Sequence, residues 1–236
     1  MRPHVSILIP AYNQPDNLRY ALQSIEMQTY TDYNIIITDD TRSDVNYEVA
    51  KEFGHLPLFY HKNKWVFGSP ANWNEALKMA NGDYIKFLHH DDWFSQPDSL
   101  ELFVEALDTH PNLDFAFSAS NGCGVDREIT YRHRITFDQV IYLNANTLLS
   151  SNLIGSPSAT IYRRSVDMEF DPNLKWLVDV DFYIRMWNRG KYFEYIDSDL
   201  VNCLVSDKSV SHIYQGSIAK RLREQVYLRW KHFGGI

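Results

Sequence analysis

The sequence places two histidines and two aspartates in succession, His89-His90-Asp91-Asp92, directly after the apolar segment 84–88. Adjacent carboxylates repel each other, so a strand that ends in such a pair indicates a cation or a positively charged ligand at its tip. The alternative is a solvated turn that binds nothing. We therefore treat Asp91 and Asp92 as candidate site residues.

Two further acidic clusters stand in comparable positions. Asp39-Asp40 follows the β-branched segment 33–38, and Asp179 and Asp181 lie near the start of a segment with helical character. In open α/β sheets ligands bind beyond the carboxyl ends of the strands, and the pairs at 39–40 and 91–92 would share such an edge. Aspartates also cap helices, so Asp39-Asp40 could instead cap the helix that follows.

The elements that must position these residues follow from the spacing of apolar side chains. Strand and helix patterns alternate through the first half, which predicts an α/β fold with a mostly parallel central sheet and helices on both faces. The predicted strands span residues 5–9, 33–38, 58–61, 84–88 and 115–118. One helix is predicted to begin with Asp16 as its N-cap and to end near Gln28, and another to end at Gly82 as its C-cap.

The second half is less regular. Residues 121–158 carry polar residues and glycines without sustained periodicity, which predicts a loop-rich half. Helices are predicted from Pro97-Asp98 onward, over residues 179–188 and over residues 217–233. Because no repeat or low-complexity linker interrupts the chain, residues 1–236 are predicted to form one domain.

Composition narrows the function classes. The chain has 236 residues, 44% of them hydrophobic, and a formal net charge of -7, which argues against nucleic acid as the main partner. Cys123 and Cys203 form no CxxC pair, which favours a reducing compartment. No segment reaches the about 18 apolar residues of a membrane span. We therefore expect a cytoplasmic protein, at most peripheral at a membrane surface.

Several motifs in order along the chain resemble the family-two inverting glycosyltransferases of the GT-A fold. These motifs are the opening strand with Pro10-Ala11-Tyr12-Asn13, Gln28-Thr29-Tyr30, the pair Asp39-Asp40, Trp65-Val66-Phe67-Gly68 with Asn72, the acids at 91–92, and the segment from Asp179 to Arg185. The similarity covers roughly residues 4–190. Each motif is weak by itself, but their order and spacing make the set specific.

The resemblance implies a nucleoside-diphosphate sugar donor, a UDP- or dTDP-sugar, and a Mn²⁺ or Mg²⁺ ion bound by hard carboxylate oxygens. Asp92 is the first expected metal ligand, and Asp91 is expected either at the metal or near the ribose. The remaining expected donor-binding residues are Pro10, Ala11, Tyr12, Asn13, Asp40 and Asn72. Residues 1–120 would then form the donor half and residues 121–236 the acceptor half.

The resemblance also implies that Asp179 is the general base, because inversion needs one base to take the proton of the attacking acceptor hydroxyl. The acceptor would be a saccharide or a lipid-linked saccharide, as in polysaccharide biosynthesis. Asp181 is expected to be structural. Arg185 stands four residues after Asp181, so an ion pair within the helix competes with a phosphate contact.

Histidines mark the departure from the family pattern, because His89 stands where relatives often have an aspartate. Imidazole can ligate manganese-type ions, but it is equally often a neutral hydrogen-bonding group, so ligation by His89 or His90 stays open. His212 matches a late histidine near the diphosphate in relatives and is expected as a further metal ligand. A satisfied structural histidine is its alternative.

The C-terminal segment 217–233 has five basic residues and one acid. It could rest on an anionic membrane that holds a lipid-linked acceptor, or dock on the core of the protein itself. Trp73, Trp93 and Trp176 could stack on sugars but are more typical of core or rim positions.

Two other enzyme classes are disfavoured. A sugar nucleotidyltransferase would begin with a glycine-rich basic loop, and a dinucleotide oxidoreductase needs a GxGxxG motif. Neither motif follows the first strand. A non-catalytic nucleotide-sugar or carbohydrate-binding module stays open.

Overall fold

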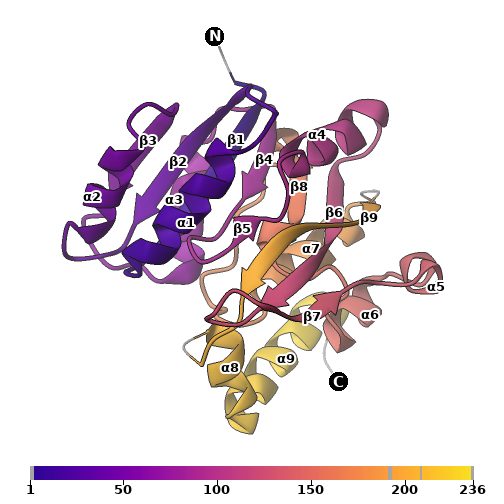
Figure 1. The fold of residues 1–236 in the computed structure, drawn as a ribbon. Helices are drawn as coiled ribbons and strands as arrows, with labels where there is room; N and C mark the ends of the chain where they lie inside the picture. Colours follow the sequence, from indigo (N-terminus) through magenta and orange to yellow (C-terminus); the bar gives the residue numbers. More distant parts are fainter. Residues whose placement is uncertain (1–2, 191–192, 208, 235–236) are drawn as a thin grey trace.

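Strands from both halves of the described chain form one mixed β-sheet (Figure 1). The structure is a computed structural model that describes residues 3–190, 193–207 and 209–234. The strands are β1 (Val5–Ala11), β2 (Tyr33–Asp39), β3 (Leu58–Lys62), β4 (Tyr84–Phe87), β5 (Trp93–Phe94), β6 (Phe115–Cys123), β7 (Ile129–His133), β8 (Thr160–Arg163) and β9 (Phe193–Leu204). The helices are α1 (Pro15–Glu26), α2 (Val45–Glu52), α3 (Ser69–Met79), α4 (Ser99–Thr109), α5 (Phe137–Ile141), α6 (Ala145–Ser150), α7 (Val178–Asn188), α8 (Val210–Gln215) and α9 (Ile218–Phe233), with short 3₁₀ turns η1 (Pro157–Ala159) and η2 (Arg164–Val166).

The strand order is β3-β2-β1-β4-β8-β6-β9-β5, with β7 paired to β6. Strands β3, β2, β1 and β4 are mutually parallel, β8 is antiparallel to both β4 and β6, and β9 is parallel to β6. It follows that β6 and β9 run in the same direction as β1. The carboxyl ends of β1, β2, β4, β6 and β9 therefore point to one side of the sheet.

Helices cover both faces of the sheet, which explains the nearly continuous apolar runs of its first strands. Alternate residues of a strand point to opposite faces. Ile7 and Ile9 of β1 pack in a core with α1, α2 and α4, whereas Leu8 packs in a second core with α3, α7 and α9. The predicted α/β architecture with helices on both faces is confirmed.

Two helix boundaries were predicted wrongly. Helix α1 begins at Pro15, and Gln14, with a left-handed φ of 55°, occupies the N-cap position, so Asp16 lies inside the first turn and pairs with Arg19. Helix α3 ends at Met79, with Ala80 as its C-cap. Gly82 has a different role, because a Cβ there would lie 2.5 Å from the Ser6 nitrogen of β1.

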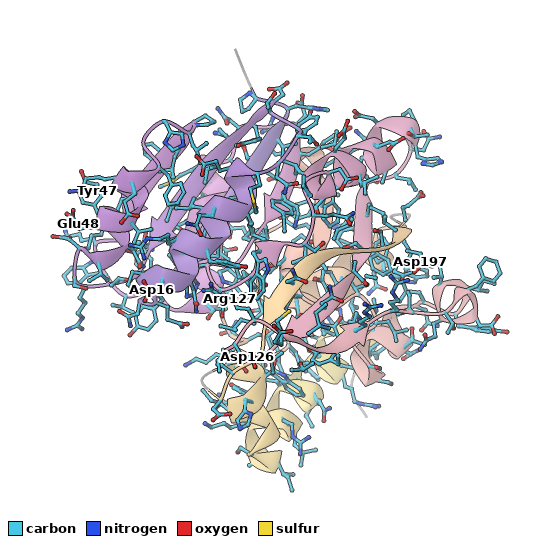
Figure 2. The ribbon with its side chains drawn as sticks, viewed as in Figure 1. Asp16, Tyr47, Glu48, Asp126, Arg127 and Asp197 are labelled. Carbon is cyan, nitrogen blue, oxygen red and sulfur yellow. The ribbon has the colours of Figure 1, made fainter. Side chains whose placement is uncertain are left out.

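The stretch 121–158 contains short elements between its loops. The N-caps of α5 and α6 are Thr136 and Asn144, and each forms a reciprocal capping box with the residue three positions on. The turn between β6 and β7 reaches back to the first half of the chain, where the Arg127 guanidinium lies 3.6 Å from the centre of the Tyr20 ring of α1 (Figure 2).

Helix α9 docks on the core of the protein, which was one of the two alternatives predicted for segment 217–233. Its Leu228 is fully buried, and the buried Glu224 accepts hydrogen bonds from the backbone nitrogens of Lys175, Trp176 and Leu177 just before α7. Within the part of the chain that the structure describes, each helix is too short or too polar to cross a membrane.

Candidate active site

Three segments from different parts of the sequence meet at the carboxyl end of β1. The Asp40 nitrogen donates to the Ala11 carbonyl at 3.0 Å, and a nitrogen of the His90 ring lies 3.2 Å from the Pro10 carbonyl. The Asn13 nitrogen donates to the Thr41 hydroxyl at 2.6 Å. The expected donor-binding segment 10–13 therefore lies beside both acidic pairs, with Tyr12 half exposed at its surface.

Asp40 is held in a buried polar network. One carboxylate oxygen accepts from the Asn63 amide and the other from the Gly68 backbone nitrogen, both at 2.8 Å. The same Asn63 amide donates to the Asn72 side chain, whose own amide donates to the Ala11 carbonyl. Gly68 has a φ of 82°, which a glycine adopts without strain and which suits its place at the start of α3. Asp40 and Asn72, both predicted from the sequence, are thus brought together.

Asp39 is a structural acid. One of its oxygens accepts from the Thr41 nitrogen and the Asn46 amide, and the other accepts from the Tyr60 hydroxyl at 2.5 Å. The alternative in which Asp39-Asp40 caps the next helix is wrong, because α2 begins only at Val45 and Asp44 occupies its N-cap. The acidic pair instead fixes the loop between β2 and α2.

His89, Asp91 and Asp92 form a cluster that could hold a metal ion. Each offers one ligand atom, and these atoms lie within 4.8 Å of one another. Burial and the neighbouring Asp91 raise the pKa of Asp92 to about 7, so two negative charges are poorly tolerated here without a cation. Burial lowers the pKa of His89 to about 4, which keeps its imidazole neutral and able to ligate. Its Nε2 is buried and has no hydrogen-bond partner among the residues that the structure describes. The two carboxylates suit Mn²⁺ or Mg²⁺, and the added imidazole nitrogen favours Mn²⁺ over Mg²⁺.

Groups from the second half of the chain hold Asp92 in place. One Asp92 oxygen accepts from the Leu204 nitrogen of β9 at 3.1 Å, and the other lies 3.3 Å from the Ser156 hydroxyl. Ser158 accepts from the His89 nitrogen through its hydroxyl, and its carbonyl accepts from the ammonium of Lys86. Lys86 is fully buried inside β4, and this burial lowers its pKa to about 7.

Asp179 lies in the first turn of α7, where the Asn152 amide donates to its carboxylate at 2.7 Å. Burial raises the pKa of Asp179 to about 6, which suits a base that accepts a proton near neutral pH. The same Asn152 amide donates to the Gly155 carbonyl, and Ser156 next to Gly155 contacts Asp92. The short segment 152–158 therefore links Asp179 to the cluster of His89, Asp91 and Asp92.

Other predicted residues have separate places. His212 is an exposed residue of α8 whose ring lies 4.0 Å from Asp207, and its role as a metal ligand stays a prediction. Arg185 forms the ion pair with Asp181 that the sequence suggested, at 2.8 Å. The tryptophans occupy core or rim positions: Trp73 packs on His89, Trp93 on Tyr20 and Trp176 on Tyr214.

Sequence reasoning missed Asn63, Asn152, Ser156 and Ser158, which are short polar residues in loops without a local pattern. Only Lys86 carried a signal, because a lysine inside an otherwise apolar strand has to be compensated when the strand is buried on both faces.

Known glycosyltransferases resemble this chain over much of its length. The family model for glycosyl transferase family 2 matches residues 6–170. An uncharacterized glycosyltransferase of Haemophilus influenzae is 24% identical over 211 residues, which cover 88% of this chain and 70% of the relative. A protein of Escherichia coli named UDP-Glc:alpha-D-GlcNAc-diphosphoundecaprenol beta-1,3-glucosyltransferase WfaP is 37% identical over 90 residues, 38% of this chain and 36% of that protein.

Solved structures share the fold at low sequence identity. The mannosyltransferase PcManGT of Pyrobaculum calidifontis, in complex with GDP-Man and Mn²⁺, superposes with a TM-score of 0.73 at 15% identity over 100% of this chain and 66% of that chain. Residues 1–349 of S. aureus TarS, in complex with UDP-GlcNAc, superpose with a TM-score of 0.72 at 18% identity, over 99% of this chain and 68% of that chain. The architecture is the GT-A fold expected from the sequence. Because the family model matches more than half of its length, this chain belongs to glycosyl transferase family 2.

Proposed function

We propose that the protein is a metal-dependent inverting glycosyltransferase that moves a hexosyl or deoxyhexosyl group from a UDP- or dTDP-sugar to a hydroxyl of a saccharide or lipid-linked acceptor. The observation that carries this proposal is the segment 152–158, which joins the half-buried carboxylate of Asp179 to the cluster of His89, Asp91 and Asp92. Such an arrangement sets a base beside a site for a charged leaving group.

The cation would be held by Asp92, Asp91 and His89. His212 of α8 would be a further ligand. When bound, a Mn²⁺ or Mg²⁺ ion supplies positive charge to the oxygens of the departing nucleoside diphosphate. The PcManGT complex, which is named with GDP-Man and Mn²⁺, supports a divalent ion as the partner of a nucleotide-sugar donor.

The nucleotide would lie along residues 10–13 and against Asp40 and Asn72. Both Asp40 oxygens already accept a hydrogen bond from the protein, which fixes the carboxylate in one orientation. A carboxylate oxygen has more than one acceptor position, so Asp40 can still accept from an N–H of a base. The named donors of the TarS complex and of the Escherichia coli relative, UDP-GlcNAc and UDP-Glc, support a uridine nucleotide.

Asp179 would take the proton of the acceptor hydroxyl as it attacks the anomeric carbon. The hydrogen bond from Asn152 orients its carboxylate, and its raised pKa makes it a stronger base than an exposed aspartate. The acceptor of the Escherichia coli relative is named as a diphosphoundecaprenol-linked saccharide, which supports a lipid-linked acceptor among the candidates.

Hydrolysis of UDP- and dTDP-sugars, measured with and without Mn²⁺, tests the proposal. We expect slow Mn²⁺-dependent hydrolysis by the wild-type protein, and a loss of about 10²- to 10⁴-fold in turnover for Asp179→Asn with little change in donor binding. Asp126→Asn, at an exposed turn, is the matched control. Donor binding without turnover in every case would favour a non-catalytic binding module instead.

A further inference from the structure

Helix α9 presents an apolar stripe to solvent on the side opposite its docked face. Ile218, Leu222, Val226 and Trp230 recur every four residues and Phe233 continues the row, with exposed fractions between 40 and 68%. Leu228 and Glu224 face the core of the protein. Val210 and Ile213 of the neighbouring α8 are also exposed, so one corner of the molecule gathers seven exposed apolar side chains. A patch of this kind marks an interaction surface.

Charge on this corner indicates the partner. Lys220, Arg223 and Arg229 are exposed on α9, whereas its single acid, Glu224, is buried and bound by backbone nitrogens. Lys231 is turned to Asp171 and Asp181 and takes no part in the outer surface. The exposed charged side chains of α9 are thus all basic, although the exposed Asp207 precedes α8 and the whole chain has a net charge of -7. A helix with Lys or Arg beside exposed Leu and Trp suits an anionic lipid surface.

The position of the corner relative to the site supports this partner. Strand β9 runs in the same direction as β1, so α8, which follows β9, lies on the side of the sheet to which the carboxyl ends of β1, β2 and β4 point. Figure 1 shows α8 and α9 beyond the ends of β6 and β9. The last residue of β9, Leu204, donates its backbone N–H to Asp92.

We propose that the outward face of α8 and α9, defined by Ile218, Leu222, Val226, Trp230 and Phe233 with Arg223 and Arg229, is a docking surface for an anionic phospholipid bilayer. Docking turns the edge of the sheet that carries Asp91 and Asp92 toward the lipid. The further consequence, that a lipid-linked acceptor reaches the site from the membrane, rests on the proposed function. The docking itself does not.

Cosedimentation with vesicles tests the docking without donor or acceptor, so its outcome is independent of any failure to detect transfer. We expect binding at low ionic strength to vesicles of equal parts phosphatidylcholine and phosphatidylglycerol, and little binding to phosphatidylcholine alone. Salt should release the protein, because the basic side chains are exposed. Leu222→Asp combined with Trp230→Asp should lower the vesicle partition coefficient by about tenfold or more.

Matched variants separate the two contributions. Phe137→Asp changes an apolar side chain on α5 that is 79% exposed and should bind vesicles like the wild type. Arg223→Glu combined with Arg229→Glu leaves the apolar stripe in place and should abolish the preference for phosphatidylglycerol. Absence of binding at low ionic strength would overturn the proposal. A dimer in light scattering that Leu222→Asp disrupts, together with equal vesicle binding by all variants, would instead assign the surface to a second copy of the chain.

Discussion

Carboxylates of the same residue type acquire different chemistry in this site. Asp40 is fixed by two neutral donors, Asp92 is buried beside another acid, and Asp179 is half-buried with one amide donor. The sequence predicted all three as site residues through their resemblance to family motifs. It could not predict Asn63 or Asn152, because these partners come from loops whose positions depend on the folded chain.

The raised pKa of Asp179 predicts a pH-dependent stability. Its pKa is about 6 in the folded protein and higher than in the unfolded chain, so the folded state binds this proton more tightly. Stability is therefore lost as the pH rises through the interval from about 4 to 6. At pH 7 we expect Asp179→Asn to unfold at a higher temperature than the wild type. The free energy of unfolding should be larger by roughly 1 to 3 kcal/mol, and this difference should vanish near pH 4.

Thermal unfolding across this pH range measures the effect without any ligand. Asp126→Asn is the control, because Asp126 is exposed in the turn between β6 and β7 and should leave the unfolding curve unchanged at each pH (Figure 2). A wild-type protein that is more stable than Asp179→Asn at pH 7 would show that the carboxylate is favourably held as an anion.

Most elements of the first half were predictable because a local pattern marks them, whereas α2 and β5 were missed. β1 and β2 carry uninterrupted apolar runs, and α1 has the spacing of an amphipathic helix. β8 and β9 were missed for physical reasons. β8 has only four residues, and β9 contains Asp197 and Asp199, whose charges interrupt the apolar alternation. Arg134 pairs with both acids, a contact that only the folded sheet creates.

The buried acid Glu224 is one of the contacts that hold α9 on the core, and its removal can be tested. Glu224 accepts from three backbone nitrogens that precede α7 and from the Tyr214 hydroxyl at 2.9 Å. Glu224→Ala leaves these donors unsatisfied and should lower the free energy of unfolding by about 1 to 3 kcal/mol. Leu222→Ala, on the exposed face of the same helix, should change it by less than about 0.5 kcal/mol. Urea unfolding compares the two variants. Equal stabilities would mean that Glu224 does not hold the helix.

At the scale of the molecule, one sheet assembles the site from both halves of the chain. The segments predicted to bind the donor lie at the ends of β1, β2 and β4, while the groups that hold Asp92 and Asp179 come from residues 152–158 and from β9. The order of motifs along the chain predicted the GT-A fold, and the solved structures share it. The predicted division into a donor half and an acceptor half stays a prediction. Residues of the second half already complete the surroundings of Asp92.

The most direct test is the affinity for UDP measured by calorimetry with and without Mn²⁺, for the wild type, Asp92→Asn and the control Asp126→Asn. If Asp91 and Asp92 hold an ion that binds the diphosphate, Mn²⁺ should tighten UDP binding in the wild type and in the control by about tenfold or more, and Asp92→Asn should lose this gain. Equal UDP affinity with and without Mn²⁺ in the wild type, or an unchanged gain in Asp92→Asn, would contradict a metal site at these carboxylates.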